Sequence, residues 1–345
     1  EHLTRKANLL ADLLLNAPQF KILVTSQERL NLQDEWVYEV QGMQYPDTPK
    51  TDGFEHYSAV ALFLQRARRV NASFILAETD RPCLVRICQL LDGNPLAIEL
   101  ASTWTRLLTC QEIVKEIDRM YRYQDNLDFL TTSLRDIPER HRTMRRVFEH
   151  SWRLLTPHEQ DLVKRLAVFQ GGSQRDAIEQ VTGAKLNLIS ALVDKSLLSR
   201  NSSGRYEAHQ LLRQYSREKL QKTPEKAQET FDKHCFYYIA FLQQREADLR
   251  GHNQKETLSE VAREIENIRA AWRWAIAHGH LQAIDQGMDS LWHFYASYGW
   301  FQEGLEMFGR ALEIVPRAEV EQADRNTQAT LGQLMAYLSW FFLRQ

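Results

Sequence analysis

Apolar side chains recur every three to four residues along most of the chain, which is the spacing of one face of an α-helix. Glycine and proline, at 14 and 9 residues, are too scarce for a turn-rich β architecture. The pattern predicts helices at 3–15, 58–70, 82–91, 96–103, 111–120, 143–155, 159–169, 174–182, 186–194, 210–220, 260–278, 281–298, 300–312 and 335–343. The fold class that we expect is therefore mostly α.

Two short segments near the start of the chain have a different pattern. Residues 21–26 (KILVTS) form an apolar run rich in β-branched residues, and residues 36–40 are β-like as well. Such a run is typical of a strand buried on both faces of a parallel sheet. Because one helix–strand unit cannot bury its faces alone, we expect the rest of this sheet to precede Glu1, in a longer protein.

Two further β-like segments flank a turn sequence, Asn-Ser-Ser-Gly at 201–204. The segments 196–200 and 205–209 flank this turn, which favours a β-hairpin. Short helices followed by a hairpin are the order of a winged-helix domain. Farther along the chain, long helices joined by short turns suggest a tetratricopeptide-like solenoid, although the 34-residue pattern is only loosely met.

These patterns divide the chain into four predicted domains. Residues 1–45 are the C-terminal end of a P-loop NTPase α/β domain, and 46–138 are a helical bundle domain. Residues 139–221 are a winged-helix domain, and 222–345 are an incomplete array of tetratricopeptide-like helical repeats.

The charge balance argues against a general attraction to polyanions. The chain has 43 Lys and Arg against 45 Asp and Glu, a formal net charge of −2 at pH 7. No global basic field therefore draws it to nucleic acid or to an anionic membrane. The basic cluster at 140–146 lacks interleaved aromatic residues and is more simply a solvated helix end. The expected recognition helix of a winged helix, 186–193, is almost wholly apolar and suits packing better than base reading.

The four cysteines, Cys83, Cys88, Cys110 and Cys235, have no zinc-binding spacing, so no metal site is predicted. Their apolar neighbours indicate reduced, half-buried thiols, which are typical of a cytoplasmic protein. No run of about 18 apolar residues occurs, so no membrane partner is expected.

Four short motifs, taken in order, are more informative than any one of them. They are residues 21–26, 93–97 (GNPLA), 195–198 (KSLL) and 209–212 (HQLL). Together they resemble the STAND class of signal-transduction ATPases with an NB-ARC-type core, as in bacterial transcriptional regulators. The resemblance covers about positions 1–220, and its second domain corresponds to the helical ARC-type domain of that class. The segment would begin just after the acidic strand end, Walker B, of the P-loop domain.

The resemblance implies a nucleotide site. In that class the proline matching Pro95, beside Gly93, packs against adenine, and the histidine matching His209 contacts the β-phosphate of ADP. Thr25 and Gln27 occupy the sensor segment, where the class commonly places an arginine that reaches the γ-phosphate. Gln27 carries no charge there, and the nearby Arg29 is more simply a surface residue. Position 210 also departs from the class, because Gln210 stands where an Asp is common.

The parts that hydrolyse ATP are missing from the sequence. It has no G-x-x-x-x-G-K-[ST] motif and no apolar strand ending in paired acids, so there is neither a phosphate cradle nor a place for Mg²⁺. This segment is therefore not expected to be an enzyme, and the parent protein would at most be a slow ATPase. The implied cofactors are ADP and ATP, with Mg²⁺ held by the parent's P-loop.

The function we expect is the regulatory part of a nucleotide-dependent signalling switch. It would hold ADP in a closed state, sense a protein or small-molecule inducer through the helical repeats, and permit ATP-driven self-association of the parent. The alternative is an interaction scaffold of winged helix and helical repeats, or a DNA-binding transcriptional regulator, without nucleotide turnover. Direct nucleic-acid binding by this segment is the less favoured form of that alternative.

Overall fold

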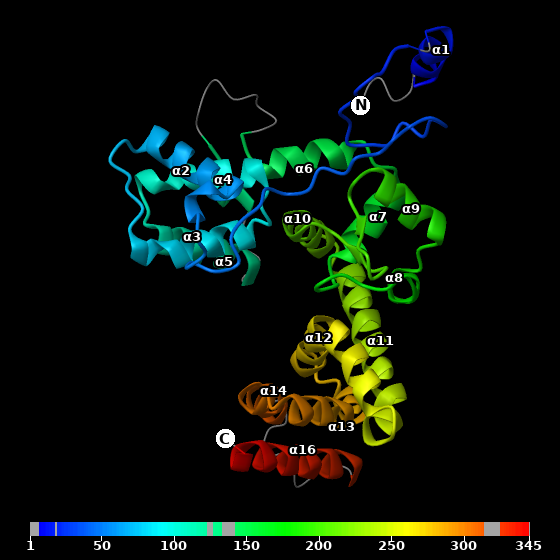
Figure 1. Cartoon of the computed structure of the whole chain (residues 1–345). Helices are drawn as coiled ribbons and strands as arrows, with labels where there is room; N and C mark the ends of the chain where they lie inside the picture. Colours follow the sequence, from blue (N-terminus) through cyan, green and yellow to red (C-terminus); the bar gives the residue numbers. More distant parts are fainter. Residues whose placement is uncertain (1–6, 18, 123–126, 133–141, 314–324, 345) are drawn as a thin grey trace. The chain divides into compact units, whose positions relative to one another are not determined.

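The computed structural model describes residues 7–17, 19–122, 127–132, 142–313 and 325–344. Helices make up most of these residues, which confirms the mostly α prediction (Figure 1). They form two compact units, each built from separate stretches of chain. Unit 1 contains Glu1–Lys164, Leu186–Arg200 and Ala208–Lys219, and unit 2 contains Arg165–Lys185, Asn201–Glu207 and Leu220–Gln345.

Unit 1 contains most of the shorter helices. These are α1 (Asn8–Asn16), α2 (Ser58–Val70), α3 (Arg81–Leu90), α4 (Pro95–Ser102), α5 (Cys110–Arg122), α6 (Met144–Arg153), α9 (Leu186–Asp194), nearly all of α7 (Pro157–Leu166) and most of α10 (Gln210–Gln221). Its single-turn 3₁₀ helices are η2 (Phe54–His56), η3 (Glu78–Asp80), η4 (Thr103–Arg106) and η5 (Leu127–Phe129). The lengths and order of the α-helices follow the apolar periodicity closely.

The core of unit 1 lies among α2, α3, α4 and α5. The side chains of Phe63, Leu84, Ile98 and Ile113 are fully buried there. One face of α10 completes the same cluster, with Leu211, Leu212 and Tyr215. His209, the residue just before α10, lies near the α3–α4 turn.

The predicted strands at 21–26 and 36–40 are absent from the structure. Both segments are irregular, and large apolar side chains in them are exposed, with Leu23 at 97% and Trp36 at 98% of their full accessibility. An apolar run becomes a buried strand only where neighbouring strands complete its hydrogen bonds. No described residue pairs with either segment in a ladder, so the strand prediction is wrong for this structure.

Unit 2 contains α8 (Arg175–Thr182) and a series of longer helices. These are α11 (Pro224–Arg250), α12 (Gln254–Ala277), α13 (Leu281–Tyr298), α14 (Phe301–Glu313) and α16 (Arg325–Arg344). Helix α11 packs against α8, α12 and α13, and α16 packs against α13 and α14 (Figure 1). We call α11–α16 the helical array. Trp272, Tyr295 and Phe308 are among its fully buried side chains.

The predicted hairpin is present but short. Strands β1 (Ser199–Arg200) and β2 (Tyr206–Glu207) form a two-stranded sheet. Asn201 organises the turn between them, because its Oδ1 accepts hydrogen bonds from the backbone N–H of Ser203 at 3.1 Å and of Arg205 at 3.0 Å. The assignments of a winged helix and of tetratricopeptide repeats remain predictions.

Candidate functional site

The connection between α3 and α4 is a tight turn in which two consecutive residues adopt left-handed backbone conformations. Asp92 has φ of 51° and Gly93 has φ of 61°. The Gly93 N–H donates to the Cys88 carbonyl at 3.0 Å, which ends α3. Asn94 then caps α4, since its Oδ1 accepts from the Ala97 N–H at 3.0 Å, and Pro95 is the first residue of that helix.

A second stretch of backbone lies directly against this turn. The Met43 N–H donates to the Gly93 carbonyl at 2.8 Å. A Cβ atom on Gly93 would lie 2.3 Å from the Met43 carbonyl oxygen, and one on Gly42 would lie 2.4 Å from the Asp92 carbonyl oxygen. Glycine is therefore required at Gly93 both by the backbone conformation and by the close approach of Met43.

His209, at the end of the hairpin, reaches this same turn. Its Nε2 lies 3.9 Å from Asp92 Oδ2, and its Nδ1 accepts a hydrogen bond from the Leu211 N–H at 3.2 Å. In the neutral ring the proton is therefore on Nε2, on the side of Asp92. Burial lowers the pKa of His209, Asp92 opposes that shift, and Arg213 adds to it.

Further polar side chains interact electrostatically with Asp92 or His209. Burial raises the pKa of Tyr45, and the Asp92 charge raises it further. Burial also raises the pKa of Tyr121, whose hydroxyl donates to the Leu90 carbonyl at 2.8 Å. The pKa of Arg213 is lowered by burial. Because the Tyr121 hydroxyl already donates to Leu90, the His209 Nε2–H beside the exposed Asp92 side chain is the donor that can bind a polar ligand by a hydrogen bond.

The structure brings together some of the predicted site residues and leaves others apart. His209 lies near Asp92, the residue that directly precedes Gly93. Pro95 is exposed at the start of α4. Thr25 lies on the exposed segment 21–26 that was predicted to be a strand, and Gln27 is the exposed residue directly after it. Gln27 Oε1 accepts from Ser151 Oγ of α6 at 3.5 Å, so its observed contact is with a different helix.

Arg29 and the basic cluster have structural partners. The backbone N–H of Arg29 donates to the Asp194 carbonyl at 3.0 Å, and its Nε lies 3.9 Å from Asp194 Oδ1. Of the cluster at 140–146, positions 140 and 141 lie outside the described residues. Arg145 forms ion pairs of 2.8 Å with Asp128 and Glu218, which is consistent with a helix end engaged within unit 1.

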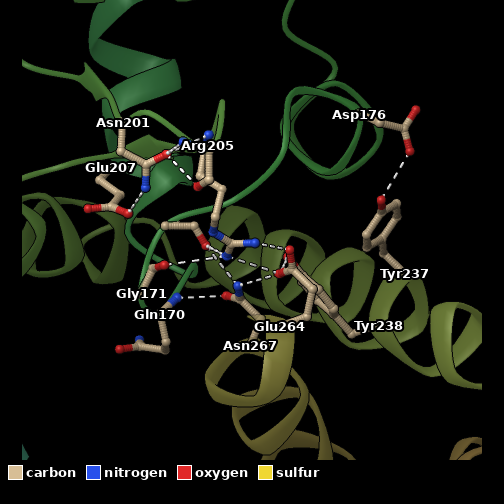
Figure 2. A network of polar contacts seen from close by, with 12 residues as sticks. Gln170, Gly171, Asp176, Asn201, Arg205, Glu207, Tyr237, Tyr238, Glu264 and Asn267 are labelled. Atoms are coloured by element: carbon tan, nitrogen blue, oxygen red, sulfur yellow. Dashed lines mark hydrogen bonds and ion pairs between the residues drawn. The ribbon is translucent and has the colours of Figure 1, made fainter. Parts of the chain in front are cut away.

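Sequence reasoning missed a buried polar network in unit 2 (Figure 2). The guanidinium of Arg205, 6% exposed, forms a two-pronged ion pair with Glu264 of α12. Its Nη2 also donates to the Gly172 carbonyl at 2.8 Å. Tyr238 of α11 donates its hydroxyl to Glu264 Oε2 at 3.1 Å, and burial raises the pKa of that phenol, with the Glu264 charge raising it further.

Asn267 extends the network by one turn of α12. Its Nδ2 donates to the Gly172 carbonyl at 2.8 Å and to Glu264 Oε2 at 3.1 Å, and its Oδ1 accepts from the Gln170 N–H at 2.7 Å. His234 is fully buried beside it, and burial lowers the pKa of this ring to about 4. The sequence carried one signal, since Glu264 and Asn267 interrupt an otherwise buried apolar face of α12.

Two other classes of site, metal sites and membrane spans, are not found among the described residues. Within the described ranges, no three His, Cys, Asp or Glu side chains gather closely enough to hold a metal ion. In the same part of the chain, no helix combines the length and the apolar content that crossing a bilayer requires.

Comparison with known proteins gives a consistent set of relatives. A protein of Mycobacterium bovis and one of Mycobacterium tuberculosis, each named "Putative HTH-type transcriptional regulator", are 31% identical over 317 residues, which cover 89% of this chain. An uncharacterized protein of M. tuberculosis is 31% identical over 238 residues, covering 65% of this chain and 56% of its own length. The similarity supports a regulator-like protein.

The match covers only part of each relative's own length. The chain spans about a third of the length of the two named regulators, 34% in each case. No family model matches the sequence, and no solved structure matches it.

Proposed function

We propose that this chain is a regulatory region of a transcriptional regulator, and that it acts through protein contacts rather than by reading DNA or turning over nucleotide. The observation that supports this most strongly is the similarity to the named regulators over 89% of the chain. Because only about a third of each relative is matched, the helix-turn-helix in their names can belong to the part outside the match.

The helical array is the proposed contact surface. Helices packed side by side bury a continuous core and leave extended outer faces for binding, as repeat proteins do. Several large apolar side chains of the array are exposed, namely Phe236, Tyr298, Trp300, Met335, Phe342 and Leu343. Exposed apolar side chains of this size are suited to contacts with another protein.

Helix α9 does not have the surface of a DNA-reading helix. Ile189 and Leu192 are fully buried, whereas Leu186, Asn187 and Ser190 are exposed. Sequence-specific helices present Arg, Lys, Asn or Gln to base edges and further cations to phosphates. With one exposed amide and no cation within α9, this helix offers little for either task.

We therefore expect weak, unspecific DNA binding by this chain. Fluorescence anisotropy with labelled random duplexes should give dissociation constants of about 100 µM or weaker at physiological salt, the weak end of ordinary non-specific binding. Charge reversal of Lys185, which precedes α9, to Glu should change this little. Nanomolar binding to a preferred sequence, lost in Lys185→Glu, would show that the chain itself reads DNA.

A second candidate function, nucleotide binding, is favoured by one observation, the meeting of the Asp92–Pro95 turn with His209. An exposed Pro95 ring is available to pack against a base, and the Nε2–H of His209 is a donor suited to a phosphate oxygen. ADP is the ligand that the family resemblance implies. Binding by this region would regulate the protein without hydrolysis.

Calorimetry with ADP tests this second function. We expect His209→Ala to weaken ADP binding by about tenfold, or 1.4 kcal/mol, through loss of one phosphate contact. His293→Ala is the matched control, because His293 is a half-buried histidine of α13 that accepts from Arg250 Nε at 3.1 Å. An absence of heat from the wild-type chain, or equal weakening by both substitutions, would leave only the protein-contact function.

A further inference from the structure

A small hollow lies on the surface of unit 1, between the end of α2 and η4. Its volume is about 180 Å³. Its apolar lining consists of Val70, the last residue of α2, the indole of Trp104 in η4, and Leu107, whose side chain is 68% exposed. Sites for whole small molecules usually enclose about 300–1,000 Å³, so this hollow has room for one large side chain and not for a cofactor.

Hydrogen bonds within unit 1 hold two sides of the hollow in place. Trp104 Nε1 donates to the Phe129 carbonyl at 2.7 Å, and the two rings stack with their centroids 5.0 Å apart. Asn71, which follows α2, donates from Nδ2 to the Thr105 carbonyl at 3.1 Å and so ties the end of that helix to η4. The hollow is therefore formed in the free chain, which lowers the cost of ordering it when a partner binds.

Three threonines, Thr103, Thr131 and Thr132, also line the hollow. The Thr103 hydroxyl donates to the Leu100 carbonyl at 2.7 Å, and the Thr131 hydroxyl donates to the Arg142 carbonyl at 3.3 Å. Because both hydrogens are engaged within unit 1, these two hydroxyls offer a partner only acceptor lone pairs. Backbone N–H groups of a peptide can donate to them, whereas phosphate oxygens cannot.

The surface around the hollow carries positive charge that the chain itself does not neutralise. Arg106 lines the hollow and is exposed, and Arg68 and Arg69 are exposed in the last turn of α2. In the described part of the chain, no carboxylate forms an ion pair with any of these three arginines. An acidic partner is therefore electrostatically complementary to this surface.

We propose that this hollow is a docking site for an acidic segment of a partner protein, which inserts one large apolar side chain beside Trp104 and pairs a carboxylate with Arg106. Peptide N–H groups next to that apolar side chain donate to the threonine hydroxyls. A nucleic-acid strand fits less well, because its phosphates need donors and only the arginines supply them. The site belongs to unit 1 and uses no residue of the helical array, so it does not depend on the proposed function.

Fluorescence anisotropy with labelled peptides tests the site in the whole chain. The probe is a short peptide with one phenylalanine between glutamates, and two companion peptides carry glycine in place of the phenylalanine or lysine in place of each glutamate. We expect each companion to bind about tenfold more weakly than the probe, because one loses the apolar contact and the other the charge complementarity. Arg106→Glu and Leu107→Ser should each weaken binding of the probe by about fivefold.

Another exposed arginine–leucine pair of unit 1 supplies the matched control. Arg153 ends α6 and Leu154 follows it, and neither lines the hollow. Arg153→Glu and Leu154→Ser should change the dissociation constant of the probe by less than about twofold. The indole N–H resonance of Trp104, assigned by NMR with Trp104→Phe, should shift when the probe binds, since that ring lines the hollow.

The proposal is overturned if the probe does not bind, if all three peptides bind equally, or if the control variants weaken binding as much as Arg106→Glu and Leu107→Ser. Binding of the probe that leaves the Trp104 resonance unmoved would overturn it as well. A single-stranded oligonucleotide that binds more tightly than the probe, and loses affinity in Arg106→Glu, would assign the surface to nucleic acid instead. Circular dichroism checks that each variant keeps its helical fold.

Discussion

Replacing Glu264 by Leu is expected to destabilise unit 2 by about 3–5 kcal/mol, the usual cost of leaving one partner of a buried ion pair without the other. Arg205 would keep its charge in a site where it is 6% exposed, and the Tyr238 hydroxyl and Asn267 amide would lose an acceptor. The free energy of unfolding, measured by urea denaturation with circular dichroism, gives the loss directly.

Two comparisons make this prediction specific. The double variant Arg205→Met with Glu264→Leu should recover most of the lost stability, because it removes both charges. Glu260, on the same helix as Glu264, forms a partly exposed ion pair with Arg245 of α11, and Glu260→Leu should cost less than about 1 kcal/mol. Equal losses for Glu264→Leu and Glu260→Leu would mean that burial of the network is not the source of its importance.

Gly93→Ala has the second large expected effect, a loss of about 3 kcal/mol or more in unit 1. The left-handed backbone at Gly93 disfavours any side chain, and here a Cβ atom would also lie 2.3 Å from the Met43 carbonyl oxygen. The α3–α4 turn or the Met43 backbone must then shift, and the Asp92–His209 contact should loosen with it. Urea denaturation and the NMR titration of His209 measure the two consequences.

Gly53→Ala is the matched control for this prediction. Gly53 has a similar φ of 69°, but a Cβ atom there would meet nothing within 4 Å. The substitution should therefore cost only the backbone strain, about 1 kcal/mol. A Gly93→Ala variant that is no less stable than Gly53→Ala would contradict the close approach between the turn and Met43.

The sequence was a good guide to the helices. Periodicity predicted the bounds of α2 and α13 as observed, and Asn94 and Pro95 marked the start of α4 through capping and a fixed φ. The 27-residue helix α11 was predicted only as part of a generally helical region. It is buried against α8, α12 and α13 at once, so its apolar residues do not form one clean stripe.

Which residues are buried, and which side chains pair with each other, could not be predicted in the same way. Residues 21–26 have the composition of a buried strand, yet whether such a run is buried depends on neighbours that periodicity does not reveal. Arg205 and Glu264 are far apart in sequence, and each alone is typical of a solvated surface. At the candidate site, the importance of Gly93 and His209 was suggested by motif resemblance, whereas the role of Asp92 between them required the structure.

Transcription from a tethered reporter tests the regulatory role most directly. The chain would be fused to a DNA-binding domain of known operator in a bacterial reporter strain, with operator occupancy measured independently. A regulatory region is expected to change transcription relative to the DNA-binding domain alone at equal occupancy, and Phe342→Ser on the exposed face of α16 should reduce the change if the array makes the contact. Unchanged transcription from a folded, fully occupied fusion would contradict the proposed function.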